Sequence, residues 1–182
     1  MMGFAREDQL FSLCGLNCGL CPMQLDGYCP GCGGGAGNQS CKTARCSLEH
    51  GAPAYCFQCG EFPCGKYGGA DEYDSFITHQ NRLADLERAR SGGVEAYRAE
   101  QAARREILEF LLAGCNDGRR KTLYCLAANL LSLESLREAR EEAGTMMELS
   151  LKQRGAQVSA RLQAAAAREG VLLKLRRKAK KD

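Results

Sequence analysis

Hydrophobic residues with helical spacing run through the second half of the chain. The clearest stripe lies within residues 119–143, at Leu123, Ala127, Leu130 and Leu131. Its i, i+4, i+7, i+8 spacing is typical of a helix that turns one face toward a core. Similar patterns predict helices over residues 74–90, 94–113 and about 147–170, the last ending at Gly170. From residue 71 onward, the sequence therefore predicts an α-helical module.

The first 70 residues lack this periodicity. Residues 14–70 contain most of the glycines and all four prolines of the chain, and both residue types favour turns over long helices. The expected fold class is a small metal-stabilised, cysteine-rich module of loops and turns followed by an α-helical module, mostly α overall. We expect the metal-binding module in residues 1–70, the helical module packed on it in 71–170, and a basic tail in 171–182 that begins as a short strand or a frayed helix.

Cysteine dominates the first module, which contains ten of the twelve cysteines of the chain. These ten are Cys14, Cys18, Cys21, Cys29, Cys32, Cys41, Cys46, Cys56, Cys59 and Cys64. Three pairs have two intervening residues: Cys18/Cys21, Cys29/Cys32 and Cys56/Cys59. At that spacing two sulfurs can reach one ion from a tight turn. All ten are therefore candidate metal ligands.

Metal ligation is preferred over disulfide bonding because nothing in the sequence marks export. The N-terminal residues contain no apolar run followed by a small-residue cleavage site, and disulfides are rare in reducing compartments. No apolar run approaches the length of a membrane span. We therefore expect a cytoplasmic protein with no membrane association.

Zinc is the expected metal, as two or three ions, and an iron–sulfur cluster is the alternative. Separated Cys-x-x-Cys pairs are typical of zinc sites, whereas the compact four-cysteine run of bacterial ferredoxins is absent. Ten thiolates on two Zn²⁺ ions would carry a net charge of −6 beside few cations. Two cysteines are therefore protonated or outside the coordination sphere, or there is a third ion, or thiolates bridge. The pairing of the ligands remains open.

The cysteine pattern also resembles a known family. Its elements are Cys14-Gly-Leu-x-Cys-x-x-Cys-Pro, Cys-x-Gly-Cys, two spaced cysteines, Cys-x-x-Cys-x-Glu-Phe-Pro-Cys, and a later Asp-Gly-Arg-Arg-Lys with Tyr-Cys-Leu-Ala-Ala. Over about residues 10–140 this order resembles the prokaryotic family catalogued as domain of unknown function 3795. The resemblance implies a zinc-binding role for the ten cysteines and implies no substrate.

Other residues offer weaker candidates. His50 is interpreted as an exposed loop residue, with metal ligation as the alternative, and His79 as a surface residue on a helix. Cys115 and Cys125 are expected to be small buried hydrophobic residues. The glycine-rich stretch at residues 33–43 lacks both glycines that a phosphate-binding loop requires, so it is expected to be a flexible loop.

No catalytic arrangement is apparent, so an enzyme is the less favoured interpretation. Two histidines and a few scattered carboxylates do not form a nucleophile with its base and acid; Glu61 is the first carboxylate to test. The leading hypothesis is a zinc-binding, non-enzymatic binding or adaptor protein, and the alternative is an iron–sulfur electron-transfer protein. The partner would be a protein or a nucleic acid, bound by the helical face or by the tail. The six Lys/Arg and one Asp of the tail give it a charge of +5, and the other 170 residues carry −2, for a net charge of +3.

Overall fold

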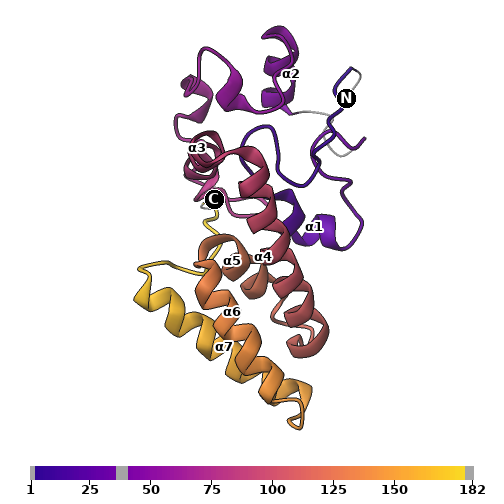
Figure 1. The fold of residues 1–182 in the computed structure, drawn as a ribbon, viewed down its shortest axis with the longest axis vertical. Coiled ribbons are helices and arrows are strands. Elements are labelled where there is room, and N and C mark those ends of the chain that lie inside the picture. The colour runs from indigo at the N-terminus through magenta and orange to yellow at the C-terminus, as the bar shows by residue number, and fades with distance from the viewer. Residues whose placement is uncertain (1–2, 36–40, 179–182) are drawn as a thin grey trace. The chain divides into compact units, whose positions relative to one another are not determined.

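A computed structural model describes residues 3–35 and 41–178. Within these residues the chain is mostly helical, with seven α-helices, three 3-10 helices and no strand. The α-helices are α1 (Pro22–Leu25), α2 (Lys42–Glu49), α3 (Arg82–Gly92), α4 (Val94–Cys115), α5 (Lys121–Leu130), α6 (Leu133–Thr145) and α7 (Leu151–Arg168) (Figure 1). Contacts divide the chain into unit 1, residues 1–99 and 176–182, and unit 2, residues 100–175. The mostly α fold is thus confirmed.

Unit 1 is built from loops and short helices around a small aromatic core. Where the structure describes it, the cysteine-rich part of this unit contains α1, α2 and three 3-10 helices. These are η1 (Cys18–Leu20), η3 (Cys56–Gln58) and η4 (Gly65–Tyr67). Phe11, Tyr55, Leu86 and Tyr97 are buried together, with the ring of Phe11 centred 4.5 Å from Tyr97 and 5.3 Å from Tyr55. The predicted loop-rich character of this region is confirmed.

A buried polar network joins the first cysteine loop to α3 and to the start of α4. Asn17 donates through Nδ2 to Asp85 Oδ2 at 3.0 Å and accepts at Oδ1 from the hydroxyl of Tyr97 at 3.0 Å. All three residues are buried, where each missing partner would leave a costly unsatisfied group. The loop between Cys14 and Cys18 is therefore fixed to two helices that lie far along the chain.

Gly15 allows this loop to approach α3 closely. Its φ of +92° is a conformation that residues with a Cβ rarely adopt, and an added Cβ would overlap the carbonyl oxygen of Arg82 in the first turn of α3. The glycine after the first cysteine is thus required by packing as well as by the turn.

The third helix begins later than the sequence predicts. We predicted a helix from residue 74, but α3 begins at Arg82 because Asp74 organises the preceding residues as a loop. Its Oδ1 accepts from the backbone N–H of His79 at 2.7 Å, and its Oδ2 accepts from the backbone N–H of Arg176 at 2.7 Å. His79 accordingly precedes the helix, with its ring bonded to Ser75 Oγ at 3.0 Å, and its placement on a helix was wrong.

Unit 2 contains a helix break that the sequence did not predict. Residues 119–143 were predicted as one helix, but α5 ends at Leu130, and Ser132 caps α6 by accepting from the backbone N–H of Ser135 at 3.2 Å. The buried Arg104 explains the break. Its guanidinium donates to the carbonyls of Ala128 at 2.9 Å and Leu131 at 2.7 Å, which satisfies acceptors that a continuous helix would have used internally.

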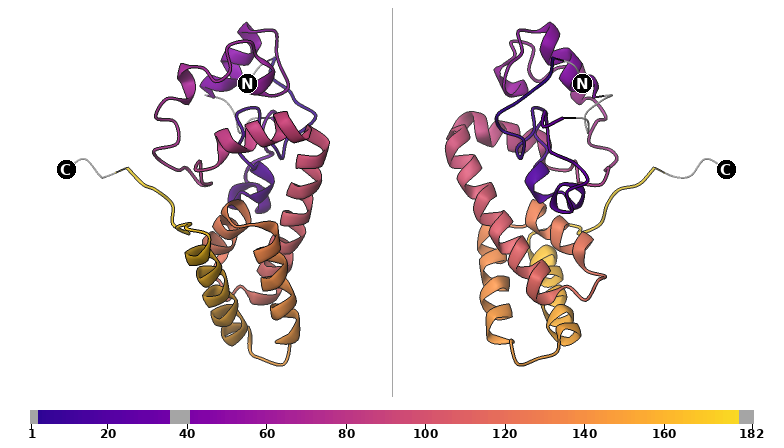
Figure 2. Two further views of the ribbon diagram at one scale, coloured as in Figure 1. Left: turned by 60° about the vertical axis from the view of Figure 1, so that its left-hand side comes forward. Right: turned by 90° about the vertical axis from the view of Figure 1, so that its right-hand side faces the viewer.

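Helices α6 and α7 lie side by side as an antiparallel pair, and α5 contacts both (Figure 2). Ser150 begins α7 with a capping box to Gln153. Gly170, at φ +67°, follows the helix in the left-handed conformation, as its predicted role at the C-terminal end requires. The predicted helix over 147–170 is therefore confirmed with a start four residues later.

The described part of the basic tail forms neither a strand nor a helix, so that prediction was wrong. Residues 171–178 are irregular, and residues 176–178 bond back to the Asp74 loop. Arg176 pairs with Asp74, Arg177 donates to the carbonyl of Ser75 at 2.9 Å, and Lys178 lies over the ring of Tyr73. The rest of the predicted tail, residues 179–182, lies outside the described residues.

Candidate metal centre

Nine of the ten candidate cysteines fall into two groups in unit 1. The first cysteine group comprises Cys14, Cys18, Cys21, Cys29 and Cys32, and the second comprises Cys46, Cys56, Cys59 and Cys64. Burial raises the pKa of the Cys18 thiol well above its ordinary value, and the four other thiols of the first group raise that pKa further. Charged thiolates are thus disfavoured there unless a cation accompanies them.

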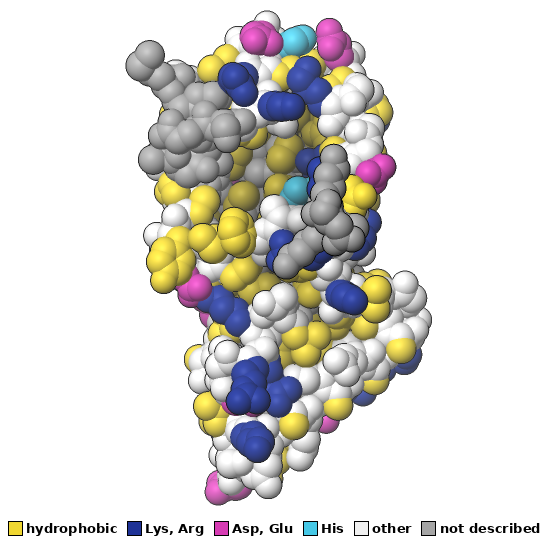
Figure 3. All heavy atoms as spheres, turned by 180° about the vertical axis from the view of Figure 1, so that it is seen from behind, with side chains coloured by type: hydrophobic (Ala, Val, Ile, Leu, Met, Phe, Trp, Pro, Cys, Tyr) yellow, Lys and Arg dark blue, Asp and Glu magenta, His cyan; other side chains and the backbone are white. Residues whose placement is uncertain are grey.

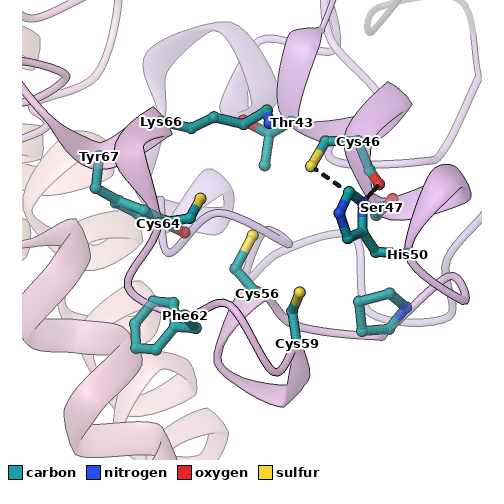
Figure 4. Close-up of a pocket in the computed structure, with 11 residues that line it drawn as sticks. Thr43, Cys46, Ser47, His50, Cys56, Cys59, Phe62, Cys64, Lys66 and Tyr67 are labelled. Atoms are coloured by element: carbon teal, nitrogen blue, oxygen red, sulfur yellow. Dashed lines mark hydrogen bonds between the residues drawn. The ribbon is translucent and has the colours of Figure 1, made fainter.

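The second cysteine group lines a small pocket that is partly open to solvent. Figure 4 shows Cys46 reaching it from α2 and Cys56, Cys59 and Cys64 reaching it from η3 and the loop that follows. Burial raises the pKa of Cys56 to about 11; the nearby Tyr67 hydroxyl lowers this pKa, and the thiols of Cys14 and Cys64 raise it.

His50 lies at the C-terminal end of α2, one helical turn after Cys46, and its imidazole borders the pocket (Figure 4). Nδ1 is 2.8 Å from the carbonyl oxygen of Cys46 and 3.6 Å from its sulfur. A carbonyl can only accept, so Nδ1 carries a proton and offers N–H, not a lone pair, to the sulfur. Nε2 lies 3.5 Å from Glu61 Oε1. Cys46, His50 and Glu61 follow the thiol, imidazole and carboxylate order of a catalytic triad. Because Nδ1 of His50 already carries a proton, it cannot deprotonate the Cys46 thiol.

Three residues that sequence analysis did not single out contact the cysteines. The ammonium of Lys66 lies near the thiol of Cys46, which raises the pKa of this exposed ammonium. The Tyr67 hydroxyl donates to the carbonyl oxygen of Cys14 at 3.5 Å and lies near the thiol of Cys56. Ser12 Oγ is 3.4 Å from the sulfur of Cys14. Lys66 and Tyr67 follow Cys64 after a single glycine, and this proximity is the sequence signal that could have identified them.

Cys41 belongs to neither group. Its sulfur accepts the backbone N–H of Ala44 at 3.4 Å at the start of α2, so it serves as a helix cap. Part of the glycine-rich stretch before it, residues 36–40, lies outside the described residues, as does the loop predicted there. Cys115 and Cys125 are both buried, which confirms their predicted place in the hydrophobic interior.

The cysteines supply the donor atoms that zinc prefers, but their side chains do not lie close enough together to hold one ion. Sulfur donors in clustered pairs are the ligands that structural zinc prefers. Nevertheless, in the described ranges no three Cys, His, Asp or Glu side chains converge closely enough to hold one ion. Rotation of a cysteine between staggered rotamers would relocate its sulfur without moving the backbone.

Comparison with known proteins gives no further assignment, because no family model, curated protein or solved structure matches the chain. None of the described helices is both long and apolar enough to span a membrane.

Proposed function

We propose that this chain is a zinc-binding protein in which cysteine thiolates hold the metal and the metal stabilises unit 1. The observation that carries the proposal is that Cys46, Cys56, Cys59 and Cys64 line one pocket. When bound, zinc would supply positive charge and cross-link the loops. The burial that now raises the pKa of Cys56 to about 11 would then be offset by the cation.

A binding or adaptor role is proposed in preference to catalysis. A zinc ion closed by four thiolates has no open position for water or substrate. The orientation of His50 argues against a thiol nucleophile at Cys46, because Nδ1 donates toward the sulfur.

The distribution of basic residues favours a protein partner over a nucleic acid. On the face drawn in Figure 3, Lys and Arg side chains form several separate small groups with other surface between them. Arg176 and Arg177 of the tail already bond to Asp74 and to the carbonyl of Ser75. Phosphate backbones are bound by continuous basic surfaces, and the described Lys and Arg side chains on this face do not form one.

The test is elemental analysis of zinc and iron on protein purified without oxygen under reducing conditions. Two or three zinc ions per chain with negligible iron would support the proposal. Four or more iron atoms per chain would replace it with the electron-transfer alternative. Absence of any bound metal after reconstitution with Zn²⁺ would overturn both.

A further inference from the structure

Ser75 and His79 face each other in the loop that precedes α3. Ser75 Oγ lies 3.0 Å from Nε2 of His79, and Nδ1 of the same ring lies 3.3 Å from the carbonyl oxygen of Ala70. A carbonyl can only accept, so Nδ1 carries a proton and the neutral ring offers the lone pair of Nε2 to the serine hydroxyl. The imidazole therefore has the orientation of a general base, with its far nitrogen held by a third group.

The surroundings of His79 favour the neutral imidazole. Burial lowers the pKa of His79, the hydrogen bond to the Ala70 carbonyl raises it, and the guanidinium of Arg82 lowers it again. The carboxylates of Asp74 and Asp71 raise this pKa, but the net shift is downward from the ordinary histidine value. At neutral pH the ring is therefore uncharged, and Nε2 is free to accept the serine proton.

The loop holds the two side chains in this arrangement. Oδ1 of Asp74 accepts the backbone N–H of His79 at 2.7 Å, and the carbonyl oxygen of Ser75 accepts Nη1 of Arg177 at 2.9 Å. The second acceptor within reach of Ser75 Oγ, the carbonyl of Ile77, is more distant at 3.5 Å. Because the backbone at both residues is bonded, little reorganisation separates this structure from the geometry of proton transfer.

The serine is accessible to an incoming molecule. Ser75 is exposed, whereas His79 is half-buried. Phe76, the next residue, is 62% exposed, so an apolar group bound at the serine has an aromatic ring to contact. Arg177 brings a positive charge to Ser75, and negative charge develops on a carbonyl oxygen when a nucleophile attacks it. These features suit a carboxylic ester with an apolar acyl group.

We propose that Ser75 is a nucleophile, activated by His79 as general base, that takes the acyl group of a carboxylic ester. Oγ bonds to the carbonyl carbon while its proton passes to Nε2 of His79. The bond from that carbon to the alcohol oxygen then breaks, and the alcohol leaves with the proton from Nε2. Water, deprotonated by the same imidazole, releases the acid and restores the serine. No step uses a cysteine, so this activity is independent of the proposed metal binding.

The experiment uses a fluorophosphonate probe, which forms a phosphorus–oxygen bond to an activated serine with loss of fluoride. The full chain is labelled, and the modified residue is located by mass spectrometry. Labelling of Ser75 is expected, at a rate that falls as the pH drops through a value below the ordinary histidine pKa of about 6.5, because protonated His79 cannot accept the proton. An unlabelled Ser75, or a rate that does not fall there, would overturn the proposal. This measurement needs no variant.

Three variants separate activation by the imidazole from simple exposure. Ser75→Ala should abolish labelling at this position, and His79→Gln, which lacks a basic nitrogen, should slow labelling of Ser75 by about 100-fold. Ser91→Ala is the matched control, because its exposed hydroxyl donates to backbone carbonyls of α3, and it should label at the unsubstituted rate. Unchanged labelling of Ser75 in His79→Gln would overturn the proposal.

The acyl step has its own readout. Incubation of the full chain with the p-nitrophenyl ester of hexanoic acid should place a hexanoyl group on the peptide that contains Ser75, and this adduct should be absent from Ser75→Ala. Adducts confined to cysteine and lysine peptides would show that Ser75 does not take an acyl group. Either result leaves the metal-binding proposal unaffected.

Discussion

Asn17 shows how much of unit 1 depends on one side chain. It lies in the turn between Cys14 and Cys18, yet its two hydrogen-bond partners, Asp85 and Tyr97, are 68 and 80 residues away along the chain. In the sequence it appears only as a polar turn residue, because nothing local indicates partners at such separations. Its role could not have been predicted from the pattern of cysteines around it.

Removing this network should destabilise unit 1 in proportion to the partners lost. Tyr97→Phe leaves Asn17 Oδ1 without its donor and is expected to lower the free energy of unfolding by about 1 kcal/mol. Asn17→Ala deprives both Asp85 and Tyr97 of a partner and should cost about 3 kcal/mol. Urea denaturation followed by circular dichroism would measure both values. Tyr28→Phe, at a side chain that is 75% exposed, is the matched control; an equal loss in that variant would contradict the explanation.

At the scale of single elements, Arg104 determines where α5 ends. Arg104→Met leaves the carbonyls of Ala128 and Leu131 without this donor. The substitution is expected to lower the free energy of unfolding of unit 2 by about 2 kcal/mol. Arg105→Met is the control on the same helix, because Arg105 pairs with the exposed carboxylate of Glu109, an interaction worth about 0.5 kcal/mol. Calorimetry of both variants would measure the difference. Similar losses would show that Arg104 acts only through its charge.

The C-terminal strap, residues 176–178, should depend on the carboxylate of Asp74. Asp74→Asn removes one of the two acceptor oxygens that receive Arg176 and His79, so trypsin is expected to cleave after Arg176 and Arg177 several-fold faster. Limited proteolysis with mass spectrometry would detect this, with the exposed Glu72→Gln as control. Unchanged cleavage would show that the strap is retained by other contacts.

Acid should release the same strap. Burial alone would raise the pKa of Asp74, but hydrogen bonds from His79 and Arg176 lower it overall. The stabilisation is therefore fully present above the ordinary aspartate pKa of about 3.9 and is lost as the pH falls through the lower value of the folded protein. The Asp74→Asn variant should lack this pH dependence.

Helix boundaries mark the limit of what hydrophobic spacing can predict. The stripes identified the helices near residues 94–113 and 147–170 because those helices bury one face. They missed the break at Leu131 and the loop before Arg82 because both depend on polar partners distant in sequence, Arg104 and Arg176. The grouping of the cysteines is of the same kind, since residues 46 and 64 line one pocket only through the path of the intervening loop.

For the whole molecule, the proposed function predicts that metal removal affects the two units differently. Unit 1 has a small aromatic core, whereas unit 2 contains well-packed helices with many buried leucines. A strong chelator under reducing conditions is expected to abolish amide protection in residues 14–64 and to leave α5, α6 and α7 protected. Hydrogen exchange with mass spectrometry would show this. Full protection of residues 14–64 after verified metal loss would mean that the loops fold without the ions.

The membership of residues 176–178 in unit 1 has a consequence for biosynthesis. Unit 2, residues 100–175, is translated between the two parts of unit 1. At about 5–20 residues per second, Arg176 reaches the Asp74 loop on the order of ten seconds after the last residue of the N-terminal part has been added. During that interval the nascent chain already carries every candidate ligand, but the Asp74 loop still lacks the strap. The cysteine-rich unit can therefore encounter metal before its own final segment has been made.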